Sequence, residues 1–580
     1  MDLVETELLT GVSADEPWAL VESFAGFKRE HPDGVNRGMD EVASRLAKHG
    51  VPVRMHEPDL YLSLPGVARV EANGQTFRAK PPAYSVDARN GLSGELVHIT
   101  VDAGSEKGDA FEAQFEASPT LIAKVSGKLV ISEGFASPAL VSLLESCGAT
   151  GVIAINPGVD VHWGICTTIW GIPGASDLPK KPGIAAVAVN RPDGDALIKL
   201  AQENATVTIF TEMEEGWFKS KLPEVTIEGT EEPDKYVLLH GHLDSWDVGV
   251  GDNATGDATM LEVARVLWAN RHKLRRSVKI CWWPGHSTGR YAGSTWYADT
   301  FALDLDANCV AQVNCDSPGC RGATEFLNVS LMSEAQAFLS DIVGEVADKP
   351  LHGERPHRAG DYSFNGIGLS SYFMLSSAMT YADREAKGYY PVGGCGMNIA
   401  WHTENDTLEI ADKDILLRDI KVYLLAVFRN ANALILPFDW RLTVKEFQET
   451  LAGYQSDAGD LFDLSPTKSA LASLMISLEK FYADAQKGTI SAAAANAVIQ
   501  DLARILVPLN FNRGPRFQHD PALTIPPLPA LEQATKIAHY PADVLGFART
   551  ELVRGQNAVI AGLRQAERHI QLVVTSSNGG

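Results

Sequence analysis

The segment YVLLHGHLDSWDVGVGDNATGDATMLEVARVLW, residues 236–268, decides the fold. It begins with apolar residues typical of a buried strand, passes through a polar loop and ends in a helical pattern whose apolar face includes Val263 and Leu267. Further buried strands are predicted at 278–283 and 310–313. Because strands alternate with helices here, the segment predicts an α/β fold, a mostly parallel sheet with helices on both faces.

The rest of the chain is predicted to form further units around this sheet. A helical stretch and short strands make residues 1–104 the N-terminal part of the same α/β domain. Short β runs separated by loops predict an inserted β-rich module over 105–215, before the main α/β region of 216–437. Strand signals fade after that, and helical periodicity predicts a helical domain over 438–580.

Composition and charge exclude several classes of protein. With 50 Lys and Arg against 73 Asp and Glu, the net charge is −23, which argues against a nucleic-acid partner. No apolar run approaches the roughly 20 residues that span a bilayer, and the first five residues include two acids, Asp2 and Glu5, where a secretion signal needs a basic start. Seven cysteines, an odd number, indicate reduced thiols. We therefore expect a soluble, cytoplasmic protein with no membrane partner.

Imidazole and carboxylate side chains follow the predicted strands. His242 comes after the first strand, Asp252 precedes the helix, Asp316 follows the third strand, and His402 lies in a later loop. Each residue alone is as well explained by a hydrogen-bonded loop histidine or a helix-capping aspartate. Ligands of α/β sheets bind beyond the carboxyl ends of the strands, however, and this set suits one Zn²⁺ or two metals that share an aspartate.

These motifs resemble those of the co-catalytic zinc metallopeptidases related to glutamate carboxypeptidase II, whose relatives include the non-catalytic transferrin receptor. The resemblance rests on His242-Leu243-Asp244-Ser245, on Asp252-Asn253-Ala254-Thr255-Gly256, on Asn314-Cys315-Asp316 and on His402-Thr403. It implies a zinc aminopeptidase-like fold, a protease-associated domain as the inserted module, and a homodimer formed through the helical domain. It also implies that the metal ligands are His242, Asp252, Asp316 and His402.

The chain departs from that pattern after the strand 278–283. The family typically has a Glu-Glu pair there, of which the first glutamate is the general base and the second is a metal ligand. His286 and Ser287 occupy these places, in PGHSTGRYAGS, residues 284–294. Three interpretations of His286 are open: it accepts or donates a proton, it is itself a ligand of the second metal, or it is a loop residue without a catalytic part.

Other residues around this departure are candidates for substrate binding. The loop is one residue longer than in the family, so Arg290 or Tyr291 can project into the pocket, and Trp401 stands where the family often has an oxyanion-stabilising tyrosine. Arginine matches the geometry of a carboxylate, although a solvated basic loop explains Arg355, His357 and Arg358 equally well. The predicted substrate-binding residues are Arg290, Tyr291, Arg355, Arg358 and Trp401.

The leading hypothesis is a metal-dependent hydrolase that cleaves a peptide or a small amide bond with one or two zinc ions. His286 would replace the usual glutamate, and Asp244 would be the second catalytic residue because it could orient His242. Two alternatives come from other classes. One is a metal-dependent lyase acting on a small carboxylate-bearing substrate, and the other is a catalytically silent dimeric binding protein like the transferrin receptor.

Overall fold

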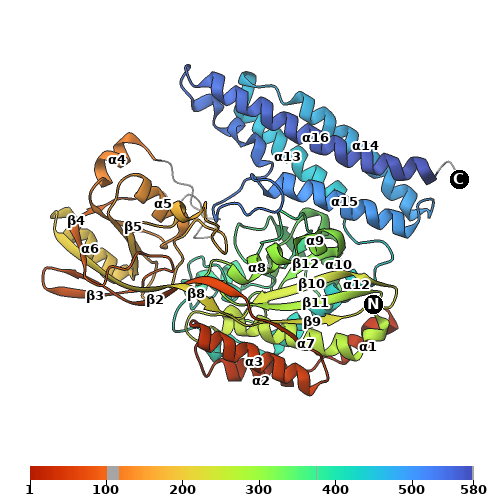
Figure 1. Cartoon of the computed structure of the whole chain (residues 1–580), viewed down its shortest axis with the longest axis horizontal. Helices are drawn as coiled ribbons and strands as arrows, with labels where there is room; N and C mark the ends of the chain where they lie inside the picture. The colour runs from red at the N-terminus through yellow and green to blue at the C-terminus, as the bar shows by residue number, and fades with distance from the viewer. Residues whose placement is uncertain (101–116, 374, 578–580) are drawn as a thin grey trace.

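The computed structural model describes residues 1–100, 117–373 and 375–577 and shows three units (Figure 1). The first is an α/β unit built on a six-stranded sheet, and the second is built on a seven-stranded sheet. The third is a set of long C-terminal helices that lies along one side of the first unit. All seven cysteines are buried and free, so no disulfide joins these units.

The six-stranded sheet carries the predicted parallel arrangement. Its strand order is β1-β9-β11-β10-β12-β15. Strand β10 pairs in parallel with both β11 and β12, and β12 pairs in parallel with β15, whereas β9 and β1 are antiparallel at one edge. The bounds are Arg54–His56 (β1), Leu222–Ile227 (β9), Glu232–His242 (β10), Arg276–Trp283 (β11), Cys309–Asn314 (β12) and Ser371–Tyr372 (β15).

Helices cover both faces of this sheet, which confirms the predicted α/β fold (Figure 1). Helix α7 is buried along most of its length, because Val263 and Leu267 pack into the large core that it shares with α2, α3 and α12. Helices α8 and α9 pack on the other face. The bounds are Leu3–Thr10 (α1), Asp15–Phe24 (α2), Pro32–Lys48 (α3), Thr255–Ala269 (α7), Ala292–Thr300 (α8), Ala302–Asn308 (α9), Gln336–Ala347 (α10) and Lys413–Asn432 (α12).

The second sheet begins earlier in the chain than the predicted module. The boundary between residues 104 and 105 lies outside the described residues, but β2 already pairs with β8 along most of its length. Residues 59–98 therefore belong with this sheet and not with the first α/β unit, because a 14-residue strand carries them away from it. In sheet order the strands are Gln75–Ala79 (β3), Asp59–Ala72 (β2), Thr206–Lys219 (β8), Leu92–His98 (β4), Leu129–Glu133 (β5), Gly151–Ile155 (β6) and Ala185–Val189 (β7), with helices Pro119–Val125 (α4), Pro138–Ser146 (α5) and Arg191–Gln202 (α6).

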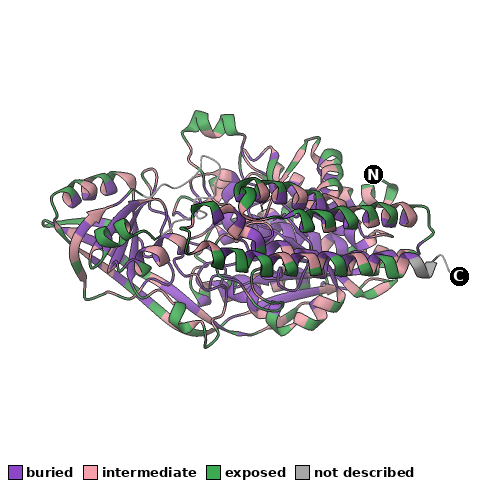
Figure 2. Ribbon diagram, turned by 90° about the horizontal axis from the view of Figure 1, so that it is seen from above, coloured by how far each residue is buried: buried purple, intermediate pink, exposed green. Residues whose placement is uncertain are grey.

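The C-terminal unit is helical, as predicted. Figure 2 shows its long helices with exposed residues on their outer side and buried residues beneath. One of them, α15, is long and apolar enough by composition to cross a membrane, with a mean hydropathy of 1.3, but half of that window is buried inside the protein. Its buried Val498, Leu502 and Leu506 make it a core helix here. The bounds are Trp440–Ala458 (α13), Ser465–Gln486 (α14), Ala492–Phe511 (α15) and Leu545–Ser577 (α16).

A buried glutamate connects the first unit to the C-terminal helices. The two carboxylate oxygens of Glu334 accept hydrogen bonds from Ser370 Oγ (2.8 Å) and from Thr443 Oγ1 of α13 (2.9 Å). The side chain is almost inaccessible, with 2% of its surface exposed. Burial raises the pKa of Glu334 to about 7, because the charged form is poorly solvated there.

The wild-type protein should lose stability as the pH approaches neutrality, and replacing Glu334 with glutamine should prevent this loss. Because the pKa is raised in the folded chain, the group stabilises the fold fully below the unfolded value of 4.5, and this contribution is lost as the pH rises toward 7. The full difference between the pKa values of Glu334 in the folded and unfolded chain corresponds to about 3 kcal/mol of unfolding free energy. Urea unfolding at pH 5 and pH 8 tests this: the wild type should lose more stability than Glu334→Gln between the two values, and equal losses would contradict it.

Candidate metal centre

The carboxyl ends of β10 and β12 bring the predicted ligands together. His242 is the last residue of β10, and Asp316 follows β12, which lies beside β10 in parallel. Asp252 comes from the turn before α7. One atom from each of these three side chains lies within 4.8 Å of the other two, and all three residues are buried.

The Nε2 atom of His242 faces two carboxylates. Nδ1 of the same ring lies 2.8 Å from the main-chain oxygen of Asp244, which can only accept, so Nδ1 is the donor in this hydrogen bond. Nε2 lies 3.0 Å from Asp252 Oδ1 and 3.6 Å from Asp316 Oδ2. Burial opposes protonation of His242, but the two carboxylates outweigh it and raise the pKa of His242 well above its usual value.

His402 approaches the other oxygen of the same aspartate. Its Nε2 lies 3.2 Å from Asp252 Oδ2, and its Nδ1 lies 3.0 Å from the main-chain oxygen of Trp163. Asp406 fixes the turn from behind, since its carboxylate accepts hydrogen bonds from the backbone N–H groups of Gly251 (2.7 Å) and Asp252 (3.0 Å). Burial raises the pKa of Asp406 to about 7. Each oxygen of Asp252 therefore faces one imidazole: Oδ1 faces His242 and Oδ2 faces His402.

The donor set fits zinc. His242 Nε2 and Asp252 Oδ1 are buried and have no hydrogen-bond partner, which is costly unless a cation binds there. One imidazole nitrogen and two carboxylates leave a fourth position open, as in catalytic zinc sites, and the Nδ1 hydrogen bond of His242 is the usual support for such a ligand. His242, Asp252 and Asp316 can therefore hold a metal ion.

His286 lies directly beside this cluster and is held by an aspartate. Its ring stacks on His242 with 3.8 Å between the ring centroids, and its Nδ1 lies 2.6 Å from Asp361 Oδ2. The other oxygen of Asp361 accepts a hydrogen bond from Ser294 Oγ (2.6 Å). Burial alone would raise the pKa of Asp361, but His286 keeps it below its usual range. No sequence motif identified this pairing, which joins residues 75 positions apart.

Asp244 supports the loop that carries His286 through hydrogen bonds. Its two carboxylate oxygens accept hydrogen bonds from the backbone N–H groups of His286 (2.9 Å) and Ser287 (3.0 Å), while its main-chain oxygen accepts from His242. The contact that orients His242 is made by the main-chain carbonyl of Asp244 and not, as predicted, by its carboxylate. The carboxylate instead fixes the loop that carries His286 and Ser287.

The predicted substrate-binding residues separate into two groups. A cavity of about 70 Å³ beside the metal ligands is lined by Arg290, Tyr291, Arg358 and Trp401. Arg355 is not among its lining residues: its guanidinium pairs with Glu446 of α13 (3.2 Å). The prediction for Arg355 is therefore wrong, because the chain turns after β14 (Leu351–Glu354) and directs this side chain toward the C-terminal helices.

The loop after β6 forms the wall next to His402, although it belongs to the second sheet. The backbone N–H of Trp163 donates to the main-chain oxygen of His402 (2.8 Å), and its own carbonyl accepts from His402 Nδ1. The indole stacks on Trp246 at 5.1 Å and donates to Asp247 Oδ2 (2.9 Å). One unit of the protein therefore orients a candidate ligand that belongs to another.

Replacing Trp163 with alanine is expected to weaken about tenfold the binding of a cation at His402, because the loop that orients His402 loses its anchor while its carbonyl remains. Competition with a chelator measures this affinity without any substrate. The exposed Trp217 of β8 provides a matched control, and Trp217→Ala should bind metal like the wild type. Equal affinity in both variants would show that the loop does not support the site.

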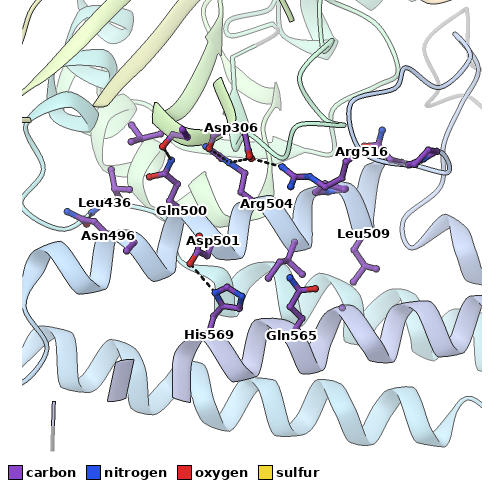
Figure 3. A pocket seen from close by; sticks show the side chains of 18 of the residues that line it. Asp306, Leu436, Asn496, Gln500, Asp501, Arg504, Leu509, Arg516, Gln565 and His569 are labelled. Atoms are coloured by element: carbon purple, nitrogen blue, oxygen red, sulfur yellow. Dashed lines mark hydrogen bonds and ion pairs between the residues drawn. The ribbon is translucent and has the colours of Figure 1, made fainter. Parts of the chain in front are cut away.

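A larger cavity of about 1030 Å³ lies between the first unit and helices α15 and α16 (Figure 3). None of the predicted ligands lines it. Its charged groups already have partners, since Arg504 and Arg516 both pair with Asp306 and His569 pairs with Asp501 at 3.0 Å. Size alone therefore does not identify the candidate site, which lies at the small cavity lined by Asp252 and Asp316.

Part of the chain is similar in sequence to known peptidases. Residues 225–427 match the sequence model described as Peptidase family M28. The "Probable glutamate carboxypeptidase VP8" of Zea mays is 28% identical over 245 residues, which are 38% of this chain and 32% of that protein. The "Probable leucine aminopeptidase 2" of Aspergillus fumigatus is 25% identical over 352 residues, which are 56% of this chain and 67% of that protein. The chain thus spans about a third of the length of the maize relative.

Among solved structures, a zinc aminopeptidase from Bacillus subtilis is similar with a TM-score of 0.54. The match covers 73% of this chain and 96% of that one at 17% identity, and it shows a shared zinc aminopeptidase-like fold. The region that matches the family model contains β10, α7, β11 and β12, and with them His242, Asp252, His286, Asp316 and His402. Residues 225–427 are therefore similar in sequence to peptidase family M28.

Proposed function

We propose that this chain is a zinc-dependent hydrolase that cleaves a peptide or a small amide bond. The observation that carries the proposal is the grouping of His242, Asp252 and Asp316, in which the buried His242 Nε2 and Asp252 Oδ1 have no hydrogen-bond partner. The match of this region to peptidase family M28 supports the same chemistry. Zinc held by these three residues would supply a Lewis acid for the scissile carbonyl and would lower the pKa of water.

His286 is the proton acceptor in this proposal. Its Nδ1–H donates to Asp361, so its Nε2 keeps the lone pair, and the residue lines the small cavity. Nε2 takes a proton from the attacking water and passes it to the nitrogen of the leaving amine. Asp361 holds the ring in the tautomer that this transfer needs, and stacking on His242 keeps it beside the metal ligands.

The two metal positions of the centre are not equivalent. The first has three side-chain ligands, His242, Asp252 and Asp316. The second position, between His402 and Asp252 Oδ2, has a serine hydroxyl where the family has a carboxylate, and a neutral hydroxyl is a poorer ligand for a divalent cation. We therefore propose one tightly held zinc, and a second cation that is bound more weakly.

Elemental mass spectrometry of protein dialysed without chelator tests the metal centre, and we expect about one zinc per chain. His402→Ala should keep that zinc, whereas His242→Ala should lose it. Two tightly retained ions would contradict the proposed inequality, and none would contradict the metal centre itself. Hydrolysis of dipeptides in ¹⁸O-water then tests the reaction class, since hydrolysis places solvent oxygen in the product and elimination does not.

A further inference from the structure

Arg290 is a buried cation without a partner beside the metal centre. Only 7% of its surface is exposed, and its Nε is buried without a hydrogen-bond acceptor. It lines the same small cavity as Asp252, Asp316 and His286. Within the described chain its guanidinium forms no ion pair, and its one ring contact is with the adjacent Tyr291, at 4.7 Å. A buried charge of this kind is costly unless an anion meets it.

The neighbouring arginine is already fully engaged. Arg358 donates to the main-chain oxygens of Asp520 (2.6 Å) and Pro521 (3.3 Å) and lies on the ring of Trp170 at 3.6 Å. Burial lowers the pKa of Arg358 to about 10. Its hydrogen bonds to main-chain oxygens fix Arg358 in the wall of the cavity. Arg290 is therefore the guanidinium of this cavity that remains available to a ligand.

The backbone holds Arg290 in an unfavourable conformation. Its φ is 44° and that of Tyr291 is 75°, a left-handed region that side chains other than glycine rarely adopt. Its carbonyl accepts a hydrogen bond from Gly171 N–H (2.6 Å), and Tyr291 N–H donates to the carbonyl of His286 (2.9 Å). The longer loop thus places the guanidinium relative to His286, and backbone strain of this kind is typical of functional sites.

The anions around Arg290 have other partners. Asp252 and Asp316 face His242 and would hold the metal, and Asp361 is occupied by His286 and Ser294. The missing anion must then come from the ligand. A guanidinium matches a carboxylate with two parallel hydrogen bonds, and the cavity of about 70 Å³ leaves little room between that carboxylate and the metal ligands.

We propose that Arg290 binds the carboxylate of the substrate, and that the substrates are dipeptides or acyl amino acids with a free carboxylate close to the scissile amide. The assignment of a substrate rests on the proposed hydrolase function, but the carboxylate site itself does not. Arg290 then selects short, anionic substrates over their neutral amides.

Two measurements on the zinc-loaded protein test this assignment. Calorimetric titration with butyrate and with its neutral isostere 2-pentanone measures carboxylate binding without turnover. Butyrate should bind the wild type 10- to 100-fold more tightly than Arg290→Met, the range for a charge-assisted pair. Hydrolysis of Ala-Ala and of its C-terminal amide should show a preference for the acid of about tenfold or more in the wild type that disappears in Arg290→Met.

The outcomes separate this inference from the hydrolase proposal. Arginine-dependent butyrate binding with no hydrolysis of either dipeptide would support the carboxylate site and count against the hydrolase. Equal butyrate affinity in the wild type and Arg290→Met would overturn the inference, because the metal alone would then capture the anion. If the methionine variant does not fold, Arg290→Lys replaces it in the test. This variant keeps the charge but loses the two parallel N–H donors of the guanidinium, so it should weaken butyrate binding. Arg271→Met, at a surface arginine on Trp268, should bind like the wild type.

Discussion

Replacing Asp252 with alanine should leave a folded protein that neither retains zinc nor hydrolyses a peptide. The two carboxylate oxygens of Asp252 face the Nε2 atoms of His242 and His402, at 3.0 Å and 3.2 Å. Without this carboxylate the first metal position keeps only His242 and Asp316. Two ligands are too few for a stable protein zinc site, so we expect zinc after dialysis to fall from about one per chain to below about 0.1.

Elemental mass spectrometry measures this loss, and far-ultraviolet circular dichroism shows whether the fold is intact. Asp195→Ala, which removes a half-exposed carboxylate that pairs with Arg191 on α6, is the matched control and should retain its zinc. Asp252→Asn keeps the shape of the side chain and removes its charge, so it should also bind zinc poorly. Full zinc content in the alanine variant would place the metal elsewhere and remove the basis for the proposed function.

The grouping of the candidate ligands was predictable because the α/β fold brings them to one edge of the sheet. His242 ends β10 and Asp316 follows β12, and two parallel neighbours in a sheet necessarily bring such positions to the same edge. Asp252 stands at the start of α7, whose apolar periodicity is visible in the sequence. Each position thus depends on one strand or helix and on the direction of the chain, both of which leave a sequence pattern.

The partners of those residues depend on contacts that leave no such pattern. His286 and Asp361 are 75 residues apart, and His402 meets the carbonyl of Trp163 across 239 residues and between two units. No local spacing connects them, and a backbone carbonyl has no sequence signature. The same limit explains the wrong prediction for Arg355, since its neighbour Arg358 turns toward the cavity while Arg355 turns toward Glu446.

Replacing His286 with alanine should lower kcat by about 10²- to 10⁴-fold while zinc is retained. The reason is that a positioned proton acceptor contributes this much to a hydrolysis, and that the ring of His286, held by Asp361 through Nδ1, stacks on His242. Asp361→Asn should lower kcat by about 10²-fold or more with little change in KM, because the amide no longer holds the ring in the required tautomer. Turnover of the dipeptide Ala-Ala and zinc content are measured on the same samples.

His569→Ala provides the control, because it removes an imidazole whose Nδ1 likewise pairs with an aspartate, Asp501, but in the C-terminal helices. It should leave kcat and zinc content as in the wild type. The three interpretations of His286 then give different results. Lost turnover with zinc retained supports proton transfer, and loss of a bound metal ion makes His286 a ligand. Unchanged turnover and metal content would exclude both, and the tight contact with Asp361 would then serve only to hold the loop that carries Arg290.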